Sequence, residues 1–145
     1  MYERKPTILF LCSGNSCRSQ MAEGFLRKWA GNRFEIFSAG LEPQRVVHPL
    51  AVEVMDEIGI DLRSQSPKSV TKYLGKIAIA NVIFLCERAE EMCPYLYPGV
   101  SNRLSWPFED PTTVAGSTAE KLEKFRTIRD QIGARIQIWL RQPEQ

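Results

Sequence analysis

The stretch FLCSGNSCRSQMAEG, residues 10–24, joins an apolar run to an amphipathic segment through a short turn of glycine, serine and asparagine. The run that leads into it, TILFLC (7–12), is apolar on both faces, which is typical of a central strand in a parallel sheet. The segment that follows repeats apolar residues at helical spacing, and we expect Asn15 or Ser16 to cap this helix and Gly31 to end it. Its apolar face consists of Met21, Ala22, Phe25, Leu26 and Trp29.

The rest of the chain alternates short β-rich runs with longer helical patterns, which predicts βαβ units around a parallel sheet. The expected strands are residues 7–12, 33–40, 81–86 and 103–106, and the expected later helices begin at Pro49, Pro67 and Ser117. Ser117 and Glu120 match a capping box at the start of the last helix. We therefore expect a single α/β domain over residues 1–145, with a four-stranded parallel sheet and helices on both faces.

Composition excludes several classes of function. The 145 residues can form one core, and the hydrophobic fraction of 43% and charged fraction of 25% are ordinary for a globular domain. A net charge of +2 leaves no electrostatic footprint for nucleic acid. The apolar run at residues 7–12 is too short for a signal peptide or a membrane span. We expect a cytoplasmic monomer with no nucleic-acid or membrane partner.

The turn itself has the form C-x5-R from Cys12 to Arg18. A loop that leaves a strand and enters a helix points successive N–H groups inward, and the helix N-terminus adds partial positive charge. We expect Gly14 and Asn15 to adopt the positive φ values that such a loop needs. Arg18 supplies a planar fork for two oxygens of a tetrahedral oxyanion. The predicted binding loop comprises Ser13, Gly14, Asn15, Ser16, Cys17, Arg18 and Ser19.

Cys12 ends the first strand at the mouth of this loop. A thiolate near a helix N-terminus and an arginine is stabilised, so we expect the pKa of Cys12 to lie below that of a free cysteine. Ser19 could donate a hydrogen bond to the sulfur. Cys12 is therefore the candidate nucleophile, whereas Cys17 falls in the first helical turn and is expected to pack in the core.

Cys86 and Cys93 form a second pair, in the segment CERAEEMC after the third expected strand. The carboxyl ends of parallel strands meet at one edge of a sheet, so Cys86 and Cys12 could share a site. The chain has no C-x2-C knuckle, which argues against zinc. A buried structural thiol is an alternative for Cys86, while a redox relay explains both cysteines. If residues 87–92 are helical, the two thiols lie about 10 Å apart, beyond disulfide reach, and the segment has to loop out.

CSGNSCRSQMAEG resembles the phosphate-binding loop of the low-molecular-weight protein tyrosine phosphatase superfamily, and in detail that of its thioredoxin-coupled arsenate reductase branch. The similarity extends from Thr7 to the end of the last helix, and it includes SAG (38–40), the segment 86–93 and FEDP (108–111). In that superfamily an aspartate just before a proline protonates the leaving group. The resemblance assigns this role to Asp110, although Asp110 and Pro111 could also simply begin a turn.

The arsenate reductases of this branch use three cysteines in sequence. The resemblance implies that Cys12 attacks arsenate, that Cys86 then attacks Cys12 and releases arsenite, and that Cys93 finally attacks Cys86. Thioredoxin would reduce the resulting disulfide, and no tightly bound cofactor is required. Phosphate and sulfate would bind as analogues of arsenate.

The alternative is a low-molecular-weight protein tyrosine phosphatase, which would hydrolyse phosphotyrosine or aryl phosphates through a Cys12 phospho-enzyme. Such phosphatases usually carry aromatic residues just after the acid, where this chain has Thr112 and Thr113. An oxyanion-sensing module that does not catalyse is a third interpretation. The cysteines at 86 and 93 favour the reductase, because a phosphatase has no need of them.

Some members of this branch bind potassium beside the loop. The resemblance implies a potassium ion near Asn15, Glu23 and Ser38, all of which are present. The acidic position of the following segment is occupied here by Lys68. We hypothesise that the Lys68 ammonium replaces some or all of the role of the cation.

Overall fold

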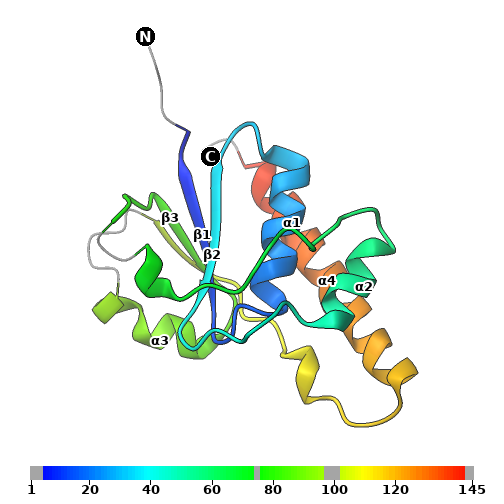
Figure 1. Cartoon of the computed structure of the whole chain (residues 1–145). Coiled ribbons are helices and arrows are strands. Elements are labelled where there is room, and N and C mark those ends of the chain that lie inside the picture. The colour runs from blue at the N-terminus through cyan, green and yellow to red at the C-terminus, as the bar shows by residue number, and fades with distance from the viewer. Residues whose placement is uncertain (1–4, 74–75, 97–101, 143–145) are drawn as a thin grey trace.

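A parallel sheet with the strand order β2-β1-β3-β4 forms the centre of the molecule (Figure 1). The computed structural model describes residues 5–73, 76–96 and 102–142. The strands are β1 Thr7–Cys12, β2 Glu35–Gly40, β3 Asn81–Phe84 and β4 Asn102–Ser105. The helices are α1 Arg18–Ala30, α2 Pro49–Asp56, α3 Glu87–Leu96 and α4 Thr118–Leu140, with short 3₁₀ turns at η1 Val70–Lys72 and η2 Pro111–Thr113. The predicted α/β fold with its four-stranded parallel sheet is confirmed.

Strand β1 is the most deeply buried strand because it pairs on both edges and is covered on both faces. Residues 8–11 are fully buried, and each large aliphatic side chain buried in this way stabilises the fold by about 1.5–3 kcal/mol. In the register of the sheet, Cys12 lies opposite Gly40 of β2, and Leu11 lies opposite Phe84 of β3. The carboxyl ends of three neighbouring strands therefore meet at one edge of the sheet.

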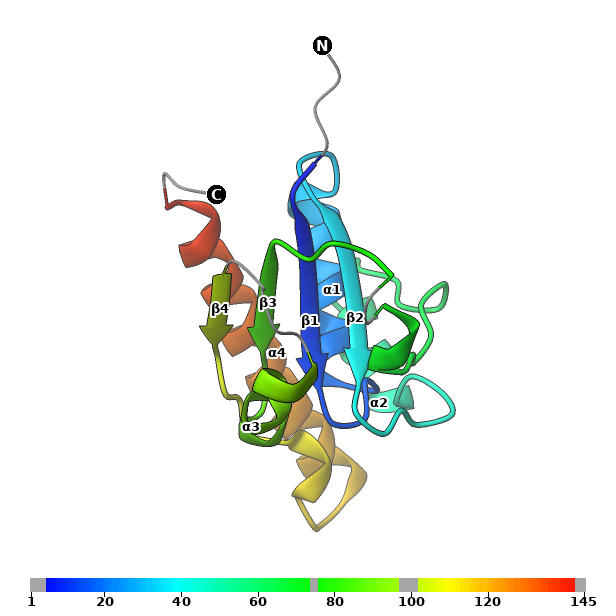
Figure 2. The same ribbon diagram turned by 90° about the vertical axis from the view of Figure 1, so that its left-hand side faces the viewer.

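The helices cover the two faces of the sheet unequally. Figure 2 shows α1 and α4 behind the sheet, with α3 on the opposite side near the carboxyl ends of the strands. Helix α1 packs against α4 at Gly133, where an added Cβ would lie 2.9 Å from the Phe25 ring. Helix α2 is joined to α4 through Arg129, whose Nη1 donates to the Val54 carbonyl at 2.8 Å. The capping box predicted for α4, Ser117 with Glu120, is confirmed.

Three local expectations are wrong. The helix predicted from Pro67 is only the turn η1, because the backbone before it bridges to the end of β2 through Gly40 and Ser69. The N-cap of α1 is Cys17 rather than Asn15 or Ser16, because the loop curls for longer than local propensity suggests. Trp29, predicted to be buried, is 37% exposed and lies against the Phe25 ring at the surface.

Among the described residues, none of the helices has the length and apolar character that a membrane span requires.

Candidate active site

The loop after β1 is held from behind by hydrogen bonds to its carbonyl groups. Every carbonyl from Cys12 to Cys17 accepts a hydrogen bond from outside the loop, at 2.9–3.2 Å. The donors, in order, are the backbone N–H groups of Leu41, Glu42 and Gln44, the Gln20 side-chain amide, and the backbone N–H groups of His48 and Met21. Because the N–H and C=O of a peptide plane point in opposite directions, this arrangement turns the N–H groups toward the concave side of the loop. A concave set of N–H groups binds anions.

The start of α1 adds to this cradle. Its N-cap, Cys17, makes no side-chain capping hydrogen bond, so the first turn presents uncapped N–H groups and the positive end of the helix dipole. Asn15 has φ 50°, as predicted, and its buried side chain donates to Ser19 Oγ at 2.7 Å and Ser38 Oγ at 2.9 Å. The positive φ predicted for Gly14 is absent. An added Cβ at Gly14 would lie 3.1 Å from Gln44 Cγ, which belongs to a flexible side chain that can move aside.

Gly40 at the end of β2 allows the loop to lie against the sheet. An added Cβ there would lie 2.7 Å from the Ser13 carbonyl oxygen and 3.0 Å from Asn15 N. Both neighbours are backbone atoms of the anion-binding loop, so neither can move without distorting it.

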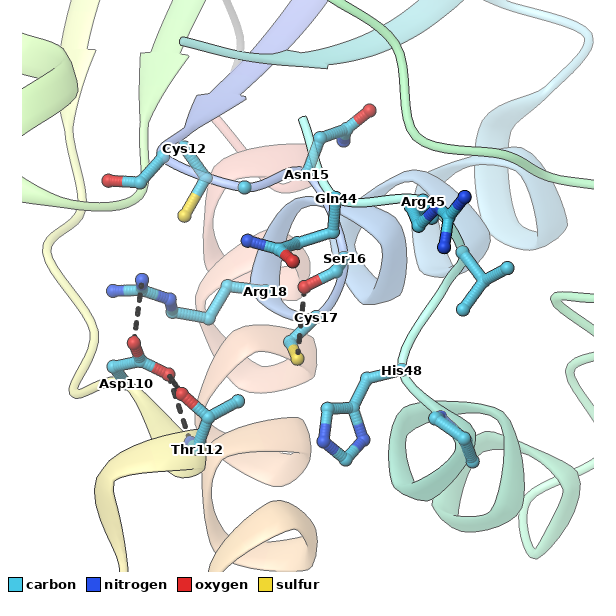
Figure 3. Close-up of a pocket in the computed structure, with 14 residues that line it drawn as sticks. Cys12, Asn15, Ser16, Cys17, Arg18, Gln44, Arg45, His48, Asp110 and Thr112 are labelled. Carbon is cyan, nitrogen blue, oxygen red and sulfur yellow. Dashed lines mark hydrogen bonds and ion pairs between the residues drawn. The ribbon is translucent and has the colours of Figure 1, made fainter. Parts of the chain in front are cut away.

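A cavity of about 560 Å³ opens in front of the loop (Figure 3). Arg18 lies in its floor, 9% exposed, with Nη1 donating to the Phe108 carbonyl at 2.9 Å and Nη2 3.7 Å from Asp110 Oδ2. Asp110 caps the turn η2, and its Oδ1 accepts from Thr112 N at 2.9 Å and Thr112 Oγ1 at 2.7 Å. Thr112 thus fixes one carboxylate oxygen and leaves the other facing Arg18 and the cavity.

Cys12 and Cys86 lie together at the carboxyl ends of β1 and β3, close enough for each thiol to shift the pKa of the other. The neighbouring Cys12 thiol lowers the pKa of Cys86 to about 5, with further support from Ser13 Oγ, 3.5 Å away, and from the Ala89 N–H in the first turn of α3. These contacts favour negative charge on Cys86.

The expectation that the pKa of Cys12 is lowered is wrong for this arrangement. The neighbouring Cys86 thiol and burial together raise the pKa of Cys12, although Arg18 acts in the opposite direction. A contact with a residue far along the chain outweighs the local loop. Burial also raises the pKa of Cys17, to about 12, so that its thiol remains protonated. Cys17 packs in the core, as predicted, while also lining the cavity.

Cys93 lies in α3, and its side chain is outside the part of the chain that the structure describes. The first turns of α3 are exposed apart from Ala89, which is fully buried. Side-chain contacts join the described part of this helix to the rest of the molecule. Arg88 Nη2 donates to Glu42 Oε1 at 2.5 Å, and Ser105 Oγ donates to Glu90 Oε1 at 2.6 Å.

The residues expected near potassium form one buried group behind the loop. Ser38 Oγ donates to Glu23 Oε1 at 2.5 Å, and Asn15 is joined to the same Ser38 hydroxyl. Lys68 Nζ lies 3.9 Å from Glu23 Oε1, and burial lowers the pKa of this lysine. In the described residues no group of three acidic, histidine or cysteine side chains could hold a metal ion.

Sequence reasoning missed the segment between β2 and α2, residues 41–48. Its backbone N–H groups orient the loop, and Gln44, Arg45 and His48 line the cavity. Because it acts largely through its main chain, its residue types carry no motif that could have identified it. The nearest signal was SAG (38–40), which leads into it.

Comparison with known proteins gives a consistent result. The model of the family "Low molecular weight phosphotyrosine protein phosphatase" matches residues 7–145. A protein of Halalkalibacterium halodurans named arsenate reductase is 44% identical over 132 residues, which cover 91% of this chain and 93% of the relative. A solved structure described as an arsenate reductase in the phosphate-binding state has a TM-score of 0.74 and 33% identity, covering 93% of this chain and 96% of its own. A thioredoxin-dependent arsenate reductase of Corynebacterium glutamicum has a TM-score of 0.66 and 30% identity, covering 95% of this chain and 65% of its own.

Proposed function

The chain belongs to the low-molecular-weight phosphotyrosine protein phosphatase family, and from that premise we propose that this enzyme reduces arsenate to arsenite through a cysteine relay, with thioredoxin as the reductant. The observation that carries the proposal is the proximity of two thiols: Cys12 and Cys86 shift each other's pKa, and Cys86 Sγ lies 3.5 Å from Oγ of Ser13, the residue after Cys12. Hydrolysis of a phosphate ester needs only the first of these thiols. Reduction needs a second thiol within reach of the first, and its thiolate is the attacking form.

In the first step, arsenate binds to the inward N–H groups of the loop and to the Arg18 guanidinium. As the tetraoxyanion is drawn into the cradle, the shared proton of the thiol pair passes from Cys12 to Cys86, and the Cys12 thiolate attacks arsenic. An arsenic–oxygen bond breaks, and Asp110 protonates the departing oxygen so that it leaves as water. Oδ2 of Asp110 suits this role because Thr112 occupies the other oxygen.

In the second step, Cys86 passes its proton to an oxygen of the bound arsenic group and attacks the Cys12 sulfur. The sulfur–arsenic bond breaks, and its electron pair remains on arsenic, which is thereby reduced from As(V) to As(III). Arsenite leaves, and a Cys12–Cys86 disulfide is formed. Ser13 Oγ and the Ala89 N–H favour the attacking thiolate, because both stabilise negative charge on Cys86.

In the third step, the Cys93 thiolate attacks Cys86 and frees Cys12. The two residues are seven positions apart in α3, about 10 Å along an intact helix, so the intervening turns have to unwind. Thioredoxin then reduces the Cys86–Cys93 disulfide, and the two electrons replace those transferred to arsenic.

The alternative is hydrolysis of phosphotyrosine or aryl phosphates through a Cys12 phospho-enzyme, with the same loop and the same acid. This alternative leaves the contact between Cys12 and Cys86 without a role. Among the described residues, those that line the cavity include no phenylalanine, tyrosine or tryptophan to pack against a phosphotyrosine ring. Weak hydrolysis of small esters is compatible with the reductase proposal.

The decisive experiment is an arsenate-dependent NADPH oxidation assay with thioredoxin and thioredoxin reductase. We expect sustained turnover for the wild type, a single turnover for Cys93→Ser with a Cys12–Cys86 disulfide visible by mass spectrometry, and no arsenite from Cys12→Ser. Replacing thioredoxin by glutaredoxin and glutathione should reduce the rate severely, because the final disulfide lies within one chain. Equal hydrolysis of an aryl phosphate by the wild type and Cys93→Ser, with no oxidation of NADPH, would contradict the proposal.

A further inference from the structure

The cavity is much larger than the oxyanion that we propose for it. A tetraoxyanion of five heavy atoms fills the space of two or three water molecules, each about 30 Å³. The cavity measures about 560 Å³, which is within the range of sites for organic ligands. Most of the space in front of the loop is therefore available to a group attached to the anion.

The outer wall of this space comes from residues 44–48. The backbone N–H of Gln44 donates to the Gly14 carbonyl, and that of His48 donates to the Ser16 carbonyl, both at 2.9 Å. These bonds attach the wall directly to the rim of the cradle. Figure 3 shows the Gln44 side chain reaching over the loop toward Arg18 and the His48 ring reaching toward Cys17. A ligand held in the cradle would extend past this wall.

The wall presents hydrogen-bond donors without partners. Among the described residues, the Arg45 guanidinium and the Gln44 carboxamide make no hydrogen bond or ion pair. His48 Nδ1 accepts from Leu50 N at 3.1 Å, and burial lowers the pKa of this histidine, so the neutral ring carries its hydrogen on Nε2.

The charges that line the cavity favour a second anion. They belong to Arg18, Arg45 and Asp110. Asp110 is engaged by Thr112 and Arg18, and Arg18 also contacts the Phe108 carbonyl in the floor. Of the three charges, only that of Arg45 has no partner among the described residues. A free guanidinium binds a carboxylate or phosphate through two parallel hydrogen bonds.

We propose that Arg45, supported by Gln44 and His48, forms a second anion subsite, so that the cavity binds small organic phosphate monoesters that carry a second acidic group. The phosphate occupies the cradle, and the carboxylate or second phosphate lies on Arg45. Such esters then compete with arsenate. The inference rests on the oxyanion site of the proposed function, but not on the reduction step.

The test compares two esters of matched length, phosphoglycolate and ethyl phosphate, with inorganic phosphate as the reference ligand. Binding is measured by calorimetry on Cys12→Ser protein, in which neither ester can be turned over. We expect phosphoglycolate to bind about tenfold more tightly than ethyl phosphate, as one charge-assisted hydrogen-bonded contact provides. With Arg45→Gln added, the affinities for the two esters should differ by less than about twofold, and the affinity for ethyl phosphate should be unchanged. Arg33→Gln is the matched control, because it removes the same charge from an exposed site just before β2, at the opposite end of that strand.

Equal affinity for the two esters, or equal weakening of both by Arg45→Gln, would overturn the subsite. Failure of inorganic phosphate to bind would overturn both the subsite and the proposed function. If the tenfold preference and its loss in Arg45→Gln are observed in a protein that does not reduce arsenate, the subsite is supported and only the reductase proposal fails.

Discussion

The anion-binding loop and helix α3 lie at the same edge of the sheet, but they are held in opposite ways. Every carbonyl of residues 12–17 is bonded from outside, and the buried Asn15 joins the loop to Ser38. Among the described residues 87–92, α3 buries only Ala89, and its contacts to the rest of the molecule include an exposed ion pair and a hydroxyl–carboxylate hydrogen bond. The loop that would bind the anion is thus held by many contacts, whereas the start of α3, which the proposed relay requires to move, is weakly held.

This difference has a thermodynamic meaning. Donors that are oriented in advance stabilise developing charge without reorganising during the reaction. A helix end with few buried contacts opens locally at low cost. The proposed relay needs both properties, because Cys12 has to remain in place while Cys86 moves from Cys12 to Cys93.

The largest expected effect comes from disturbing the rigid side with Gly40→Ala. The added methyl group would lie 2.7 Å from the Ser13 carbonyl oxygen, so the loop has to shift. A displacement of about 1 Å can cost a factor of 100, and we expect phosphate affinity measured by calorimetry to fall about 10- to 100-fold. Gly14→Ala is the control, since its methyl group first meets the flexible Gln44 side chain, and it should change affinity less than about threefold. Wild-type affinity in a folded Gly40→Ala protein would show that the loop is not rigid.

The charge on the Cys86 sulfur can be followed by pH titration. Because the pKa of Cys86 is about 5, its thiolate persists above that pH and is lost as the pH falls through it. The thiolate absorbance of the wild type minus that of Cys86→Ser should therefore rise with a midpoint near pH 5, the thiol-to-thiolate ratio changing tenfold per pH unit. Ser13→Ala should move the midpoint upward, because it removes a hydrogen bond to the sulfur. A midpoint above neutrality in the wild type would contradict the charge assignment.

A smaller effect is expected from releasing α3. Arg88→Gln or Glu42→Gln removes the exposed ion pair that holds the helix, and we expect the Cys86–Cys93 disulfide to form roughly two- to fivefold faster. In the double variant, the disulfide should form no faster than in either single variant. Arg63→Gln, which breaks the exposed pair with Asp56 elsewhere, is the control. Rapid quenching and mass spectrometry after one arsenate turnover give the rates, and an unchanged or slower rate would mean that this pair does not restrain the helix.

The smallest expected effect is on the reduction rate, and it concerns Lys68 and Glu23 in the buried group behind the loop. We propose that Lys68 replaces potassium, since its Nζ lies 3.9 Å from Glu23 Oε1. Replacing sodium by potassium at constant ionic strength should change the arsenate reduction rate of the wild type less than about twofold. Lys68→Met should make the rate depend on potassium. A strong stimulation of the wild type by potassium would count against the proposal.

The features that follow from local pattern were predictable from the sequence. The apolar run at β1, the turn after it and the capping box of α4 are each encoded within a few residues. The meeting of Cys12 with Cys86 was also predictable, because the carboxyl ends of parallel strands share an edge.

The local consequences of distant contacts were not predictable. The pKa of Cys12 is set by Cys86, and the helix expected at Pro67 is replaced by a bridge to Gly40. The support of the loop by residues 41–48 uses main-chain N–H groups, which nearly every residue type provides.

That main-chain support has an evolutionary consequence. The N–H groups of the loop are oriented by hydrogen bonds from other backbone groups. Such a site can bind a tetrahedral anion even when the side chains around it change. In the proposed function, the thiol of Cys86 after β3 decides whether the bound anion is reduced. Recognition of the anion and its chemical fate would then be set by two different parts of the sheet edge.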